Sequence, residues 1–267
     1  MTDIEIICIG NELLIGKIKN TNAHWLATQI TKLGATVTRI TVIQDIVEEI
    51  GRTINETKAR KPSFIITTGG LGPTFDDKTL QGVGNALGLE MEVNPVAFEF
   101  VKQRTFEYLK KRGMPLNVEM TPPRVKMATF PEGTDPITNP IGSAPAMRTV
   151  INETVLFVLP GVPAEMEAIF KDTIAPEIAQ AVGEGVFCQL SLFVEGIFES
   201  RLAPLIDAVM KANKDVYIKS HPLIGHIELH LTIRASQNHN PAEMLLKASK
   251  EMVKLIEQNN GKVLVEP

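Results

Sequence analysis

The sequence predicts an α/β protein with a doubly wound, mostly parallel β-sheet and a second, smaller α+β domain. In its first third, apolar strand-like runs alternate with helix-like segments at about 30 residues per unit. This alternation stops at Gly183, Glu184 and Gly185, and a β-α-β-β-α-β order follows. We therefore expect one domain over residues 1–182 and another over residues 186–267.

The first part of the larger domain contains three strand–helix units. Continuous apolar, β-branched runs are typical of parallel strands buried on both faces, and they occupy residues 4–9, 36–43 and 64–67. Polar caps and apolar periodicity predict helices at residues 23–33, 47–59 and 77–87. Right-handed crossovers between such strands place helices on the faces of the sheet.

The second part of the larger domain has a less regular pattern. It predicts a helix over residues 95–112, a loop over 115–123 and a short strand over 125–130. Two β-like runs, residues 147–151 and 155–159, flank a hairpin turn at Asn152 and Glu153. A final helix begins at Pro163 and ends near residue 182.

The smaller domain is predicted to have helices on one side of a mixed sheet. Strands are expected at residues 187–194, 216–219, 227–235 and 262–265, and helices at 198–212 and 241–258. His226 and His230 share a strand face, but zinc would need a third ligand, for which His221 is the near candidate. No G-x-x-G loop occurs here, so the sequence gives no support for KH-type RNA binding.

Composition argues against several classes of protein. The chain has a net charge of −4 and a pI of about 5.8, whereas a dedicated nucleic-acid binder is usually basic. Its two cysteines, Cys8 and Cys188, lie in apolar runs typical of reduced core residues. No signal peptide or membrane-spanning run is visible, so we expect a cytoplasmic protein.

A glycine-rich turn after the third strand is the strongest sign of a ligand site. Gly69, Gly70 and Gly72 separate a buried strand from a helix, an arrangement that presents backbone N–H groups to an anion. The turn matches neither of the common nucleotide-phosphate fingerprints. Asp76 and Asp77 follow it, either as ligands of a divalent metal or as caps of the next helix.

Two further carboxylates are expected near this turn. Ligands of parallel sheets bind beyond the carboxyl ends of the strands, where the loops carrying Glu12 and Asp45 meet the turn that carries Asp77. Alternatively, Glu12 and Asp45 are only solvated or capping residues of their loops.

Five motifs in order over residues 1–180 resemble those of CinA proteins. Two lie near the amino terminus: Gly10-Asn11-Glu12-Leu13-Leu14-x-Gly16 and Asn20-Thr21-Asn22. The third is the glycine-rich turn, from Thr68 to Thr79. The last two are Asn139-Pro140-x-Gly142-x-Ala144-Pro145 and Leu159-Pro160-Gly161-Val162-Pro163-x-Glu165-Met166.

The resemblance implies a fold and an activity. It implies a molybdopterin-binding, MoaB/MogA-like fold and a KH-type second domain. The amidase domain that many CinA proteins carry at the C-terminus is not expected in this chain, so we expect no amidase activity. It further implies a homo-oligomeric pyrophosphatase that cleaves ADP-ribose, or FAD, to AMP and a sugar phosphate. The implied cofactors are a divalent cation (Mg²⁺, Co²⁺ or Mn²⁺) and K⁺ as a helper. In molybdopterin-handling relatives the functional aspartates align with Asp77 and Asp45.

These considerations give a hypothesis for the site, with a small nucleotide as the ligand. Asp77, Asp45 and Glu12 are the candidate catalytic residues, and Asp77, Asp76 and Asp45 the candidate metal ligands. The candidate residues for binding the ligand come from the glycine-rich turn and the other motifs: Gly10, Asn22, Thr68, Gly69, Gly70, Leu71, Gly72, Pro73, Thr74, Asn139, Gly142, Ala144, Pro160, Gly161, Val162 and Pro163.

Two alternatives to the pyrophosphatase remain at this point. One is a molybdopterin-binding or adenylyl-transfer protein of molybdenum cofactor metabolism, which would use the same pocket. The other is a non-catalytic module whose small domain binds RNA or a partner.

Overall fold

The computed structural model describes residues 2–183, 185–236 and 240–264. The chain divides into two compact units, which are described separately. One comprises residues 1–31 and 35–181, and the other comprises residues 182–267 together with 32–34.

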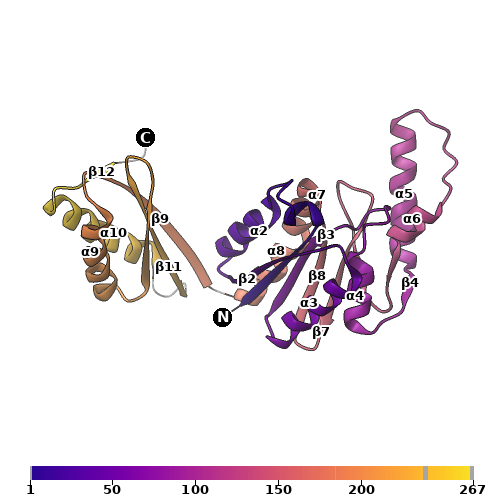
Figure 1. Ribbon diagram of the computed structural model, residues 1–267, viewed down its shortest axis with the longest axis horizontal. Helices are drawn as coiled ribbons and strands as arrows, with labels where there is room; N and C mark the ends of the chain where they lie inside the picture. Colours follow the sequence, from indigo (N-terminus) through magenta and orange to yellow (C-terminus); the bar gives the residue numbers. More distant parts are fainter. Residues whose placement is uncertain (1, 184, 237–239, 265–267) are drawn as a thin grey trace. The chain divides into compact units, whose positions relative to one another are not determined.

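The larger unit is built on a six-stranded sheet with the order β2-β1-β3-β8-β7-β6 (Figure 1). The first four strands are parallel neighbours, and β7 and β6 add antiparallel pairs at one edge. The predicted doubly wound, mostly parallel sheet is therefore confirmed. The strands are β1 (Asp3–Ile9), β2 (Thr36–Ile43), β3 (Phe64–Gly69), β6 (Asp135–Ile137), β7 (Ala146–Ile151) and β8 (Thr154–Pro160).

Helices cover both faces of this sheet, which explains why β1 and β3 are continuous apolar runs. Ile7 and Ile65 face a core shared with α3 and α4, and the alternate residues of β1 and β3 are buried as well. Trp25 of α2 packs edge-on against Phe170 at 5.3 Å between ring centroids. The helices are α1 (Asn11–Leu14), α2 (Thr21–Lys32), α3 (Val47–Ala59), α4 (Thr79–Leu87), α7 (Pro163–Ile169) and α8 (Ala175–Val182).

The predicted final helix of this unit is interrupted. Between α7 and α8 the backbone forms a π-helical segment over Phe170–Ile174. Apolar periodicity continues through the segment, so the sequence pattern did not reveal it.

A segment projects from the sheet and contains α5 (Pro95–Lys111) (Figure 1). The predicted strand over residues 125–130 is wrong for its first half, because Pro122 and Pro123 begin a short helix, α6 (Pro122–Met127). Only the end of that stretch is extended, as β5 (Thr129–Pro131), which pairs with β4 (Met91–Val93). The short strands β4 and β6 were not predicted.

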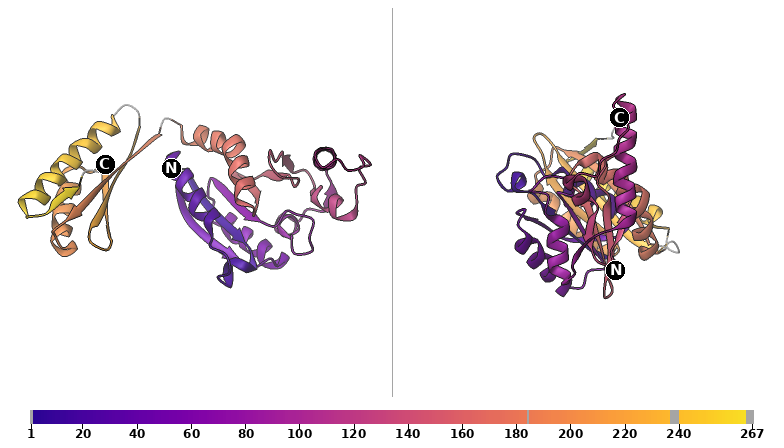
Figure 2. Two further views of the ribbon diagram at one scale, coloured as in Figure 1. Left: turned by 90° about the horizontal axis from the view of Figure 1, so that it is seen from above. Right: turned by 90° about the vertical axis from the view of Figure 1, so that its right-hand side faces the viewer.

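The smaller unit has the predicted β-α-β-β-α-β order, with α9 and α10 on one face of its sheet (Figure 1, Figure 2). Its strand order is β10-β11-β9-β12, and every neighbouring pair is antiparallel, so the predicted mixed sheet is wrong. The reason is that β11 lies between β9 and β10 and separates these two strands. The elements are β9 (Gly185–Glu195), α9 (Glu199–Ala212), β10 (Val216–Pro222), β11 (Ile227–Ser236), α10 (Pro241–Gln258) and β12 (Lys262–Leu264).

The core of the smaller unit lies between its sheet and its helices. Leu229, Leu231 and Ile233 alternate along β11 and are buried, as predicted, against α10 residues such as Met252. The predicted end of the last strand, Val265, and the boundary residue Glu184 lie outside the described residues.

Both cysteines lie in strands. Cys8 is buried in β1, where burial raises the pKa of its thiol, and Cys188 is half-buried in β9; both are free thiols. No described helix has the length and apolar character needed to span a membrane.

On the open face of the small sheet the rings of His221 and His230 lie 4.6 Å apart. His230 Nε2 lies 2.7 Å from Glu228 Oε1, but the described residues contain no group of three His, Cys, Asp or Glu side chains that could hold a metal.

Candidate ligand-binding site

A pocket of about 450 Å³ lies at the carboxyl ends of the parallel strands. It brings together the three loops that were expected to meet there, with Glu12, Asp45, Asp76 and Asp77 on its wall. We call it the acidic pocket. Its other lining residues are Ile9, Gly69, Gly70, Leu71, Gly72, Pro73, Thr74, Met127, Ser143, Ala144, Pro160, Gly161, Val162 and Glu165.

Asp77 closes the glycine-rich turn. Its Oδ2 accepts hydrogen bonds from the backbone N–H of Thr74 at 2.8 Å and from the Thr74 hydroxyl at 2.5 Å. A Cβ on Gly70 would lie 2.8 Å from the Asp77 Cα and 2.4 Å from its Oδ1, so any side chain there would displace Asp77. Glycine is thus needed in this turn for close approach.

The alternative that Asp76 or Asp77 caps the next helix is wrong. The residue at the N-cap of α4 is Lys78, and no side chain caps that helix terminus. The Oδ1 of Asp76 instead lies 2.5 Å from the same Thr74 hydroxyl, whose single proton the two aspartates share, and this contact lowers the pKa of the Asp76 carboxyl group, helped by the charges of Lys126 and Lys78. The lowered pKa keeps Asp76 ionised at neutral pH, and both aspartates contact Thr74 beside the turn.

The turn also offers hydrogen-bond donors to a ligand. Within the described chain, the backbone N–H groups of Gly70, Leu71 and Gly72 donate to no protein acceptor. Such N–H groups in a loop between a strand and a helix can bind a phosphate oxygen.

The electrostatic character of the pocket opposes an unaccompanied anion. Five carboxylates line it, and none of its described lining residues is a lysine or an arginine. Burial raises the pKa of Asp45, the N–H of Asn11 at 2.8 Å opposes that rise, and the charges of Glu12 and Asp76 add to it. A bound phosphate would therefore need a cation beside it.

The donor set fits a cation that is shared with a ligand. No three His, Cys, Asp or Glu side chains of the described residues are grouped to hold a metal by themselves. Mg²⁺ commonly takes one or two carboxylates and completes its shell with water and substrate phosphates. Asp45, Asp76 and Asp77 could supply those carboxylates.

We expect Asp45→Asn to raise the thermal unfolding midpoint at neutral pH without added metal. Because the folded chain holds the pKa of Asp45 above its usual 3.8, ionisation costs the folded state more than the unfolded state. The contribution of Asp45 to the free energy of unfolding therefore falls as the pH rises from 3.8 through the higher pKa of the folded state. The asparagine keeps an acceptor for the Asn11 N–H.

Differential scanning calorimetry tests this expectation at neutral pH and at about pH 3, below the usual carboxyl pKa, where the difference between the two proteins should vanish. Saturating Mg²⁺ should raise the midpoint of the wild type more than that of the variant. An equal difference at both pH values would show that Asp45 does not carry this cost.

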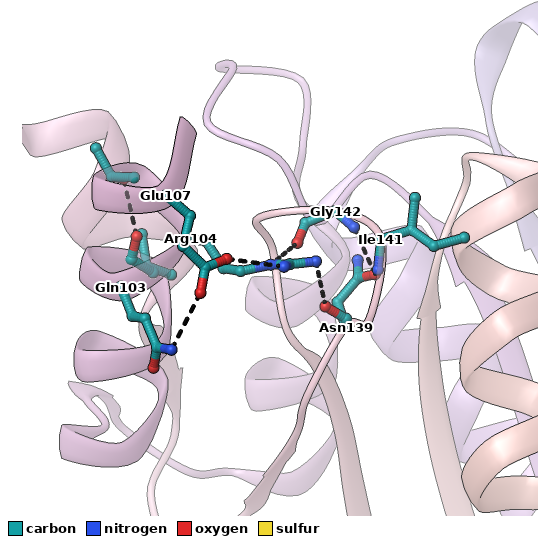
Figure 3. Close-up of polar contacts among 8 residues, drawn as sticks. Gln103, Arg104, Glu107, Asn139, Ile141 and Gly142 are labelled. Atoms are coloured by element: carbon teal, nitrogen blue, oxygen red, sulfur yellow. Dashed lines mark hydrogen bonds and ion pairs between the residues drawn. The ribbon is translucent and has the colours of Figure 1, made fainter. Parts of the chain in front are cut away.

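Arg104 of α5 holds a loop beside the acidic pocket (Figure 3). Its Nε donates to the carbonyl oxygen of Gly142 at 2.9 Å and its Nη2 to that of Asn139 at 3.0 Å, while Nη1 pairs with Glu107 at 3.1 Å. The projecting helix is thereby tied to residues 139–144, which contribute Ser143 and Ala144 to the pocket wall.

Asn139 organises the same loop from inside. It is fully buried, and its Oδ1 accepts hydrogen bonds from the backbone N–H groups of Ile141 and Gly142 (Figure 3). Its Nδ2 donates to the carbonyl oxygen of Ala144 at 3.0 Å and to Glu165 Oε2 at 2.7 Å. Asn139 therefore shapes the pocket wall and fixes Glu165, but does not line the pocket.

Several other residues predicted to bind the ligand lie behind the pocket. Asn22 is buried in α2, and its Nδ2 donates to the carbonyl oxygen of Gly161 at 2.8 Å, so it fixes the turn after β8. Gly10 leaves room for Glu12, whose Oε1 lies 2.5 Å from where a Cβ would be. None of these residues lines the acidic pocket: Gly10, Asn22, Thr68, Asn139, Gly142 and Pro163.

Comparisons with known proteins identify the family to which the chain is similar. The family model described as "Probable molybdopterin binding domain" matches residues 5–180. A protein of Aeropyrum pernix is 38% identical over 98% of this chain and 96% of its own length. A protein of Pyrobaculum arsenaticum is 39% identical over 96% and 95%, respectively.

A solved structure is similar as well. The crystal structure of the protein CinA of unknown function from Thermoplasma acidophilum is 34% identical, with a TM-score of 0.58. The match covers 66% of this chain and 98% of that one. The chain therefore belongs to the family of the probable molybdopterin binding domain and is a CinA-like member of it.

Proposed function

We propose that the acidic pocket binds molybdopterin or a closely related phosphorylated pterin. The observation that carries this proposal is the free N–H groups of Gly70, Leu71 and Gly72 beside the carboxylates, within the part of the chain that matches the molybdopterin-binding family. The N–H groups would receive a phosphate oxygen. This was the alternative interpretation of the sequence, and the family match favours it over the pyrophosphatase.

A divalent cation completes this proposal. Asp77, together with Asp76 or Asp45, would hold Mg²⁺, Co²⁺ or Mn²⁺ beside the phosphate, with K⁺ as a helper. The five carboxylates of the pocket repel an anionic ligand, and a bound cation would supply the positive charge that offsets this repulsion. The ligand is a small molecule, not nucleic acid, and we propose that the chain acts as a homo-oligomer.

The second candidate is hydrolysis of ADP-ribose, or FAD, to AMP and a sugar phosphate. The observation in its favour is the position of Glu12 and Asp45 on the wall that also carries the phosphate-binding turn. Either carboxylate could accept a proton from a water molecule that attacks a bound diphosphate. The candidate metal ligands and phosphate donors are the same as for pterin binding.

One set of measurements separates the two candidates. Molybdopterin binding is measured by calorimetry, and AMP release is followed with ADP-ribose, FAD and NAD in the presence of Mg²⁺, Co²⁺ or Mn²⁺ and K⁺. Pterin binding without AMP release would support the first candidate, and metal-dependent AMP release would support the second. If neither occurs with folded protein, both are wrong and a non-catalytic module becomes the better interpretation.

A further inference from the structure

A second hollow, of about 510 Å³, lies between α4 and the projecting segment of the larger unit. Its wall is mostly apolar and carries no carboxylate among its described residues; its one charged group is Lys126. We call it the methionine pocket. Its lining residues are Leu80, Gln81, Met91, Met120, Pro122, Val125, Lys126 and Thr129.

The methionine pocket borders the acidic pocket. Lys126 lines the former, and its ammonium group donates a hydrogen bond to the carbonyl oxygen of Thr74, which lines the latter. The next residue of α6, Met127, lines the acidic pocket. The short helix α6 thus contributes to both walls, and the Lys126 cation marks the boundary between them.

The two pockets differ in chemistry in a way that fits the two ends of one ligand. The acidic pocket offers N–H donors and carboxylates, which suit a phosphate with its cation. The methionine pocket offers flexible, polarisable thioethers, which adapt to flat rings, while Gln81 and Thr129 can meet polar atoms at a ring edge. An uncharged ring loses less on leaving water than a phosphate does, so the mostly apolar wall suits the ring better than the phosphate.

We propose that the methionine pocket holds the fused heterocyclic ring, pterin or purine, of the ligand whose phosphate binds in the acidic pocket. Lys126 then lies between the ring and the phosphate, and its ammonium group is placed to contact the phosphate. This inference rests on the proposed function, because it requires a phosphate in the acidic pocket. According to this inference, the projecting segment recognises the ring of the ligand.

The test compares ligands with and without a ring. Dihydroneopterin triphosphate and ADP-ribose carry a pterin and a purine, and inorganic pyrophosphate carries none. Val125→Trp fills the methionine pocket, and Met120→Ala removes one of its thioethers without adding bulk. The matched control for the first variant is Val96→Trp, because Val96 is exposed on α5 outside this pocket. Affinities are measured by calorimetry of the full chain with Mg²⁺.

Val125→Trp should weaken binding of at least one ring-bearing ligand by roughly tenfold or more, the range for a filled apolar pocket, and leave pyrophosphate binding unchanged. Met120→Ala should act in the same direction with a smaller factor, and Val96→Trp should have no effect. The ring-bearing ligand that responds identifies the ring. Equal weakening of all three ligands, or of none, would overturn the ring site while the phosphate site stands. If the wild type binds none of them, the ring site fails, whereas the proposed function fails only if molybdopterin does not bind either.

Discussion

Asn139→Asp is expected to lower the free energy of unfolding by about 3–5 kcal/mol at neutral pH, the cost of a buried charge without a partner. Asn139 is fully buried, and its amide N–H groups point at the carbonyl oxygen of Ala144 and the carboxylate of Glu165. Aspartate has the same shape but only acceptor oxygens when ionised. It would therefore set a negative charge against two acceptors, one of them charged.

The pH dependence of this loss separates charge from shape. The same contacts raise the folded-state pKa of the introduced carboxyl group, so the loss is present above that pKa and shrinks as the pH falls through it. Urea unfolding at neutral pH and at about pH 4, near the usual carboxyl pKa, measures the change. Asn55→Asp on the exposed face of α3 is the matched control, with an expected change within about 0.5 kcal/mol. A loss that does not depend on pH would contradict the charge argument.

The sequence predicted the main sheet well because burial on both faces leaves a strong signal. The predicted bounds of β2, α3 and α10 match the structure, and β1 and β3 differ from theirs by one or two residues. Strands of three residues, such as β4 and β6, are too short to show the alternation of apolar and polar residues that predicts a strand. The apolar residues after Pro123 resembled a strand, but the proline pair starts a helix.

The smaller unit shows a different limit. Its order of strands and helices follows from local patterns, so it was predicted correctly. Whether neighbouring strands are parallel or antiparallel depends on the position of β11 between β10 and β9. That position is set by contacts between residues far apart in the sequence, which hydrophobic periodicity does not reveal.

Some residues of the candidate site could be predicted from the sequence, and others could not. Topology alone placed Glu12, Asp45 and Asp77 at one edge of the sheet, and the structure puts all three on one pocket wall. The sequence did not point to Met127 or Ser143, because they reach the pocket from the projecting segment and its return loop. The motifs were right about the neighbourhood of Asn22 and Asn139, but only the fold shows that both hold loops in place from behind.

Asp77→Asn is expected to weaken metal-dependent binding of the phosphorylated ligand by roughly 10- to 100-fold, the range for losing a metal-site carboxylate or its support. The substitution keeps the volume of the side chain and one acceptor oxygen for Thr74. It should lower the free energy of unfolding by only about 1–2 kcal/mol, the difference between a charged and a neutral acceptor. Calorimetric binding and urea unfolding measure the two effects. Asp172→Asn, at an exposed position outside the pocket, is the control.

The response to metal concentration shows which role of Asp77 dominates. If Asp77 acts through its charge on the cation, excess Mg²⁺ should restore most of the lost affinity, because the turn and its free N–H groups are intact. If Asp77 acts by closing the turn onto Thr74, excess Mg²⁺ should restore nothing, because the N–H groups of Gly70 and Gly72 no longer face the ligand. Unchanged binding at limiting as well as at saturating Mg²⁺ would remove Asp77 from the site altogether. The acidic pocket would then need another explanation for its glycine-rich turn.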